Sequence, residues 1–151
     1  MSKKDKILIV ITIILVAVLI GGFVWDYNGF LLKRTLKIEI TDDMDVISMN
    51  KAGTLFYRKA YEARIKLPRE KAEDELNLIV QTYGADAEIM DDHEFSHFAE
   101  ESFKSELLKP QPVTGTEVAV VKATDGDDLV TFMMDVENES DAFIYVYYYR
   151  G

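Results

Sequence analysis

Five residues in the middle of the chain have the types and the spacing of a metal-dependent hydrolytic site. They read His93-Glu94-Phe95-Ser96-His97, and both histidines of the chain lie among them. Side chains four positions apart on a helix point the same way, so His93 and His97 could bind one Zn²⁺ as metal ligands. Glu94 could then act as the catalytic general base on a metal-bound water. The chemistry that this pattern allows is hydrolysis of a peptide bond.

The motif resembles the signature of zinc-dependent metallopeptidases, over these five residues only. The resemblance implies a small membrane-bound zinc peptidase as an alternative function. Helix phase argues against it, because Phe95, Phe98 and Ala99 form an apolar arc opposite the two histidines. We therefore expect the histidines to face water, on a solvated polar helix face. The sequence leaves open whether a carboxylate from beyond Pro110, such as Glu117 or Asp135, is a third metal ligand.

The last strand of the chain suggests a surface for another protein. Phe143, Tyr145, Tyr147 and Tyr149 alternate along one face of it, and the opposite face is apolar as well. Tyrosine offers a large contact area and a hydroxyl group, which suits interfaces. We interpret these four side chains as a candidate interaction surface. The alternative is that they form cross-strand pairs or are covered by another segment.

Aspartates cluster at a turn before that strand. Asp125, Asp127 and Asp128 could be read as calcium ligands, but they lack the regular ligand spacing of a calcium-binding loop. Asp-Gly is typical of a tight hairpin turn. The sequence therefore predicts a hairpin here.

The elements that position these residues follow from periodicity. Alternating residues predict strands at 36–40, 46–49 and 57–67, and three more at 116–123, 129–136 and 142–149. Pro68, a 3.6-residue apolar period and Gly84 predict a helix between them. A second helix is expected over 92–108, with Asp91 and Glu94 at capping-box spacing. This order predicts an α+β domain in two layers, with two helices on one face of a mainly antiparallel sheet of about five strands.

An uninterrupted apolar run precedes the domain. Residues 7–25 contain no charge and are 19 residues long, close to the ~20 residues that cross a bilayer as a helix. The run is longer than the apolar stretch of a signal peptide, and no small-x-small cleavage site follows it. We expect a retained signal-anchor helix over 7–25, a membrane-proximal connector over 26–35 and a domain over 36–151. Trp25 and the aromatic residues after it suit the outer interface.

Charge orients the anchor and limits the partners. Residues 1–6 hold three lysines and one aspartate, which favours a cytoplasmic N-terminal flank and a domain outside the cell membrane. The rest of the chain then has 14 basic and 26 acidic residues, a net charge of −12. Such a surface repels nucleic-acid backbones, so no nucleic-acid partner is expected. The chain has no cysteine, which excludes disulfides and thiol catalysis.

These observations favour a single-pass membrane protein whose acidic domain is a protein-interaction or accessory module rather than an enzyme. The expected partners are the lipid bilayer, through residues 7–25, and a protein of the cell envelope. No cofactor is expected for such a module. Zinc would be a cofactor only if the chain is the alternative, a peptidase.

Overall fold

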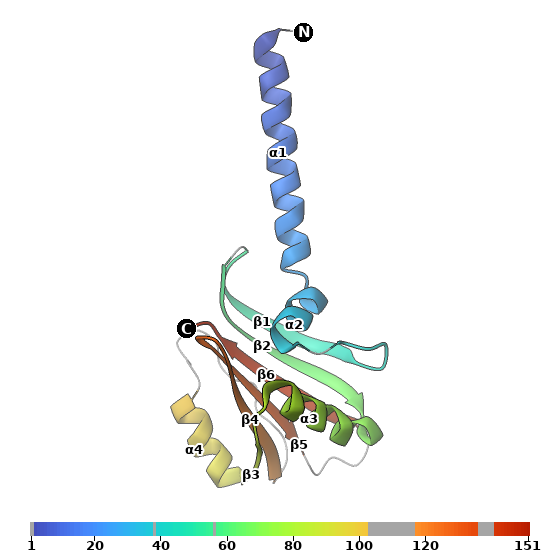
Figure 1. Ribbon diagram of the computed structural model, residues 1–151, viewed down its shortest axis with the longest axis vertical. Helices are drawn as coiled ribbons and strands as arrows, with labels where there is room; N and C mark the ends of the chain where they lie inside the picture. The colour runs from blue at the N-terminus through green and yellow to red at the C-terminus, as the bar shows by residue number, and fades with distance from the viewer. Residues whose placement is uncertain (1, 38, 56, 103–116, 136–140) are drawn as a thin grey trace.

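The computed structural model describes residues 2–37, 39–55, 57–102, 117–135 and 141–151 (Figure 1). An α+β domain follows a long N-terminal helix. In chain order the elements are α1 (Lys3–Trp25), α2 (Asn28–Leu36), β1 (Asp45–Thr54), β2 (Tyr57–Pro68), α3 (Arg69–Tyr83), β3 (Ala87–Asp91), α4 (Asp92–Ser102), β4 (Glu117–Asp125), β5 (Asp128–Asp135) and β6 (Asp141–Tyr149).

The six strands form one open antiparallel sheet in the order β1-β2-β6-β5-β4-β3. The chain's last strand is therefore an interior strand, paired with β2 on one side and with β5 on the other. An interior strand covered on both faces has apolar residues at successive positions, because neither face meets water. This explains why both faces of residues 142–149 are apolar or aromatic.

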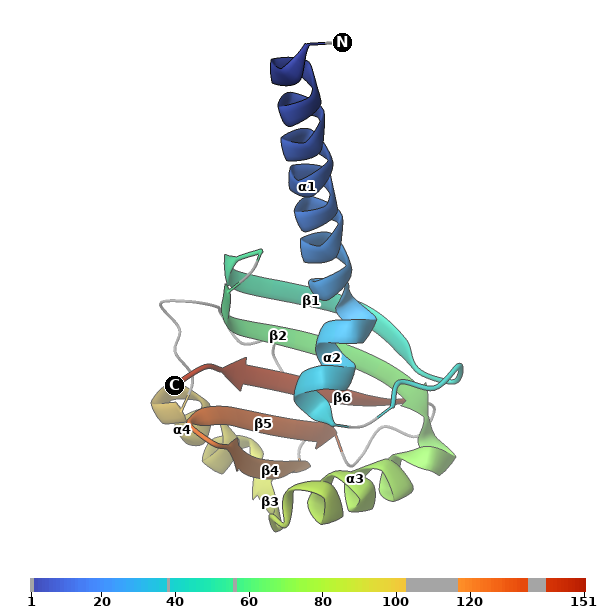
Figure 2. The ribbon, with the colours of Figure 1, turned by 45° about the horizontal axis from the view of Figure 1, so that its top comes forward.

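One face of the sheet packs beneath α2 and α3 (Figure 2). Pro68 precedes α3, and Gly84 ends it in the left-handed conformation (φ 59°), as the sequence predicts. Its buried residues are Ala72 and Ile79, which belong to the same apolar cluster as Tyr61. The predicted apolar face of this helix is confirmed.

The other face of the sheet packs against α4. Phe95 is buried there with Met133, Tyr145 and Tyr147. The expectation that both helices lie on one face is wrong, because α3 and α4 pack against opposite faces. The physical reason is that Tyr145 and Tyr147 of β6 point away from α3 and need a separate cover. Of the predicted helix over 92–108, residues 103–108 lie outside the described residues.

The structure differs from the sequence prediction in three elements. Residues 28–36, expected to lie within a connector, form the helix α2, and its Leu31 and Leu32 are 1% and 0% exposed in the core. The predicted strand at 36–40 is wrong: Leu36 ends α2, and the described residues of 37–44 contain no strand. The additional short strand β3 forms the sheet edge beside β4.

The helix α1 is long and apolar enough to cross a membrane, and it projects away from the domain (Figure 1). Its apolar side chains are exposed along nearly the whole length. A helix of this kind near the N-terminus is compatible with a membrane anchor or with a signal sequence.

The burial of α2 predicts a large effect of truncating one side chain. Leu32→Ala should lower the free energy of unfolding of the full chain by about 3 kcal/mol, because it leaves a cavity in the core. Leu78→Ala on α3 is the matched control, since Leu78 is 43% exposed; it should cost less than about 1 kcal/mol. Urea unfolding in detergent micelles, followed by circular dichroism, measures both. Equal, small effects would show that α2 is not part of the core.

Candidate membrane-proximal site

The structure places the His-Glu motif on the solvent side of α4. Both His93 and His97 are exposed, and the nearest charged partner of His97 is Glu101, with 3.5 Å between Nε2 and Oε1. Glu94 closes a capping box: its backbone N–H donates to Asp91 Oδ1 at 2.8 Å, and its own carboxylate accepts the Asp91 N–H at 3.2 Å. The Glu94 carboxylate therefore has a structural role at the start of this helix.

The motif is not the centre of a metal-binding cluster in the part of the chain that the structure describes. Within the described ranges, no group of three His, Cys, Asp or Glu side chains is placed to hold a metal ion. Of the open candidates for a third ligand, Asp135 is buried on β5 and Glu117 is exposed at the start of β4. The arrangement around α4 is thus that of a solvated helix face.

The aromatic residues of β6 are mostly enclosed. Tyr145 and Tyr147 are each 3% exposed and belong to the cluster beneath α4, whereas Phe143 and Tyr149 are half-buried at its margin. A groove of about 420 Å³ opens beside this cluster. Among its lining residues are Phe98, Leu129, Tyr147 and Tyr149. Only the margin of the predicted interaction surface is accessible there.

The Asp-Gly turn is the predicted hairpin between β4 and β5, with Gly126 at φ 65°. Asp125 accepts from Lys37 Nζ at 2.8 Å, and Asp128 accepts from the Tyr148 hydroxyl at 2.6 Å. Burial, and then the hydrogen bond to Asp128, raise the pKa of Tyr148, so this hydroxyl stays a donor at neutral pH. These two aspartates thus have partners within the domain.

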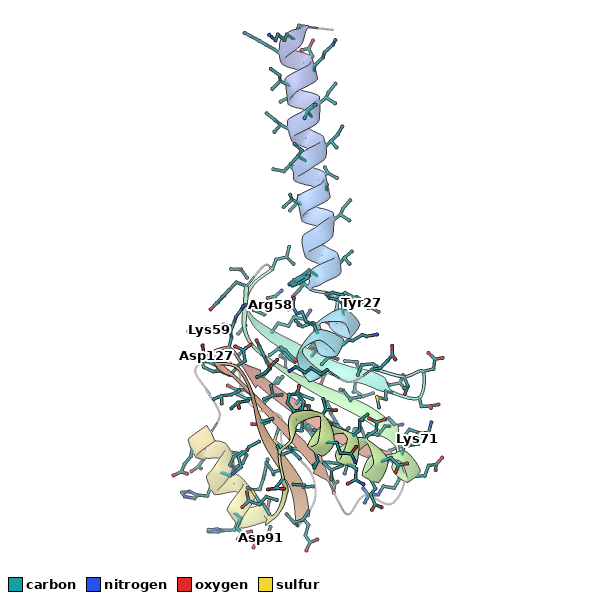
Figure 3. The ribbon with its side chains drawn as sticks, in the orientation of Figure 1. Tyr27, Arg58, Lys59, Lys71, Asp91 and Asp127 are labelled. Carbon is teal, nitrogen blue, oxygen red and sulfur yellow. The ribbon has the colours of Figure 1, made fainter. Side chains whose placement is uncertain are left out.

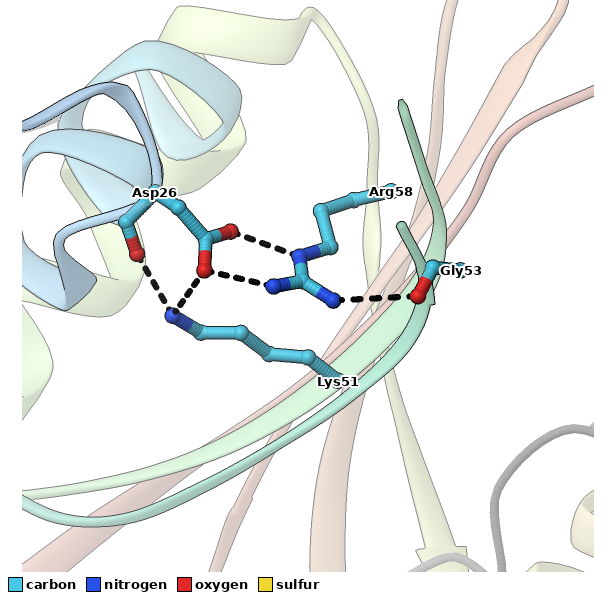
Figure 4. A network of polar contacts seen from close by, with 4 residues as sticks. All are labelled: Asp26, Lys51, Gly53 and Arg58. Atoms are coloured by element: carbon cyan, nitrogen blue, oxygen red, sulfur yellow. Dashed lines mark hydrogen bonds and ion pairs between the residues drawn. The ribbon is translucent and has the colours of Figure 1, made fainter. Parts of the chain in front are cut away.

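A compact polar network joins the end of α1 to the sheet (Figure 4). Asp26 is the C-cap residue of α1. Its carboxylate accepts two hydrogen bonds from Arg58 of β2, from Nε at 2.6 Å and from Nη2 at 2.5 Å. Lys51 of β1 donates to the Asp26 backbone carbonyl at 2.5 Å and lies 3.3 Å from its carboxylate. A bidentate contact between an arginine and a carboxylate fixes the relative orientation of the two groups as well as their distance. The direction of α1 is therefore fixed relative to the first two strands.

Little water reaches this network. The side chains of Asp26, Lys51 and Arg58 are 12%, 17% and 17% exposed. The hydrogen bond from Arg58 is the main cause that lowers the pKa of Asp26, and the same contact raises the pKa of Arg58. Arg58 also donates to the Gly53 carbonyl at 3.2 Å, inside the β1–β2 hairpin.

A cleft of about 340 Å³ opens beside the network. Its lining comes from six elements, from the β1–β2 turn and from the residue after β6, which meet at one end of the sheet. The lining residues are Trp25, Arg34, Leu55, Arg58, Asp125, Asp128, Tyr148 and Arg150. The Arg34 guanidinium lies over the Trp25 ring at 4.1 Å, and the Arg150 guanidinium lies over the Tyr57 ring at 4.7 Å. This cleft combines cationic groups with aromatic and apolar side chains.

Comparison with protein-family models, with curated proteins and with solved structures gives no match. The geometry of the chain itself must therefore support any assignment of function.

The sequence indicated the end of α1 but not the network or the cleft. Lys51 and Arg58 come 25 and 32 positions after Asp26, and no local pattern records a contact at that separation. The one available signal was a single aspartate directly after the apolar run, where a charged side chain needs either water or a partner.

The network predicts an acid-sensitive junction. Because the folded-state pKa of Asp26 is lowered, its stabilisation is complete above the ordinary aspartate pKa of about 3.9 and is lost as the pH falls through the lower folded-state pKa. At neutral pH, Asp26→Asn should reduce the stability of the full chain by about 2 kcal/mol. Fluorescence of Trp25, the only tryptophan, reports the transition. An unchanged stability and acid profile in Asp26→Asn would contradict this role.

Proposed function

We propose that this chain is a single-pass membrane protein that holds its acidic domain in a fixed orientation outside the cell membrane, as a non-enzymatic interaction or accessory module. The observation that carries the proposal is the junction at Asp26. A signal peptide is removed from the mature protein, whereas here the end of the apolar helix is bonded to two strands. This arrangement supports the proposal that α1 is retained as an anchor.

Flanking charge supports the orientation. Residues 1–6 hold three lysines, and the chain beyond residue 25 is strongly acidic. Positive flanks remain in the cytoplasm, so residues 1–6 are assigned there and the domain outside. The aromatic residues Trp25, Tyr27 and Phe30, all exposed or half-buried, then lie at the outer headgroup level.

The groove beside α4 supports an interaction role. Leu129 at its margin is 45% exposed, and Phe98 and Tyr149 are half-buried beside it. Apolar grooves with aromatic walls and a polar margin accept apolar side chains of a protein partner. We propose that an envelope protein binds this groove, rather than the whole aromatic face of β6. The solvent-facing histidines of α4 give no support to a peptidase.

Cysteine labelling tests the topology, because the natural chain has no cysteine. Asp127→Cys on the exposed β4–β5 turn should react with a membrane-impermeant maleimide in intact cells. Lys4→Cys in the N-terminal flank should react only after permeabilisation. Recovery of the domain as a released fragment, or the reverse labelling pattern, would contradict the proposal.

Photo-cross-linking tests the groove. A photoreactive amino acid at Leu129 should form a discrete cross-link to one protein in native membranes. The same amino acid at Leu78, equally exposed but on the other face of the sheet, is the control and should give no such product. Identical products at both positions would indicate random collision and would remove the groove as a binding site.

A further inference from the structure

The cleft beside the Asp26 network lies at the level where the apolar helix ends. Trp25, the last residue of α1, is one of its walls. The β1–β2 hairpin reaches the level of the end of α1 in both ribbon views, and Figure 3 shows Arg58 of that hairpin near the end of α1. If α1 spans the bilayer, this cleft faces the headgroups of the leaflet where α1 emerges.

Two arginines in the cleft have donors available for a ligand. The guanidinium groups of Arg34 and Arg150 lie over the Trp25 and Tyr57 rings. A guanidinium group over an aromatic ring can still donate hydrogen bonds from the N–H groups at its edge. Among the residues that the structure describes, no carboxylate lies within ion-pair distance of either arginine. The third arginine, Arg58, is already bonded to Asp26 and Gly53.

Neither carboxylate of the cleft forms an ion pair with Arg34 or Arg150. Asp125 is paired with Lys37, and Asp128 accepts from Tyr148. The lining therefore holds three arginines and two engaged aspartates, a small positive excess within a chain whose net charge beyond residue 6 is −12. An anion that approaches this domain is attracted to this end and repelled elsewhere.

We propose that the cleft binds the phosphate group of an anionic phospholipid in the leaflet where α1 emerges, with Arg34 and Arg150 as its ligands. Guanidinium groups donate paired hydrogen bonds to phosphate oxygens. Trp25 and Leu55 also line the cleft, and we expect them to contact the glycerol and the first carbons of the acyl chains. The inference rests on the proposed membrane anchoring and adds a specific lipid contact to it.

Native mass spectrometry of the full chain, released from membranes that contain phosphatidylglycerol and phosphatidylcholine, tests the proposal. The wild-type chain should retain phosphatidylglycerol in preference to phosphatidylcholine. Each arginine near an anionic surface should contribute about fivefold, so Arg34→Gln with Arg150→Gln should reduce the preference about 25-fold.

Two further variants separate a binding site from general charge. Lys71→Gln removes one charge at the other end of the domain (Figure 3) and should leave the preference unchanged. Arg34→Lys with Arg150→Lys keeps both charges but loses the stacked guanidinium, so it should restore only part of the preference. Circular dichroism confirms that each variant is folded.

Several results would overturn the inference. The first is an unchanged preference for phosphatidylglycerol in the double glutamine variant while the protein remains inserted in lipid. That result would refute the lipid site but would leave the anchoring proposal standing. Full restoration by the lysine pair would show non-specific attraction. Displacement of the lipid by excess inorganic phosphate would identify a site for free phosphate instead. Failure of the chain to insert into lipid would refute the anchoring proposal itself.

Discussion

The contact between Asp26 and Arg58 determines how the two parts of this protein relate to each other. A carboxylate directly after an apolar helix is costly to remove from water without a partner, and here a strand of the sheet supplies one in a two-pronged geometry. Lys51 of the neighbouring strand adds a second donor. Because Leu31 and Leu32 then enter the core only a few residues later, the chain has little freedom between helix and sheet. The consequence is a domain with a defined side toward the end of α1.

The sheet topology explains why that side carries the cleft. Since β6 lies between β2 and β5, the end of the chain, the β1–β2 hairpin and the β4–β5 turn meet at one end of the sheet (Figure 1). Arg150, Arg58 and Asp128 come together there although they are far apart in sequence. The same topology requires two apolar faces on β6, which buries Tyr145 and Tyr147. Their aromatic character therefore reflects packing as much as recognition.

Local patterns predicted much of the fold. Pro68 and Gly84 bounded α3, Asp-Gly predicted the β4–β5 turn, and alternation predicted β2, β4, β5 and β6. The helix α2 was missed because its buried surface consists mainly of Leu31 and Leu32, too few residues to establish a period. The short strand β3 was missed because only Met90 of its five residues is buried. The cleft was beyond sequence reasoning, since its arginines come from α2, β2 and the residue after β6.

The proposed role of the Asp26 junction depends most on a fixed angle between α1 and the sheet. Double electron–electron resonance spectroscopy measures this angle through the distance between two spin labels. The labels are attached at Ile20→Cys on α1 and Glu73→Cys on α3, both exposed positions. The full chain is reconstituted in lipid nanodiscs for the measurement. If the junction is rigid, the labelled chain should give one narrow distance distribution, which should broaden when Asp26→Asn is added. A broad distribution in the otherwise unmodified chain would contradict a rigid junction, because it would mean that helix and domain are joined by a free hinge.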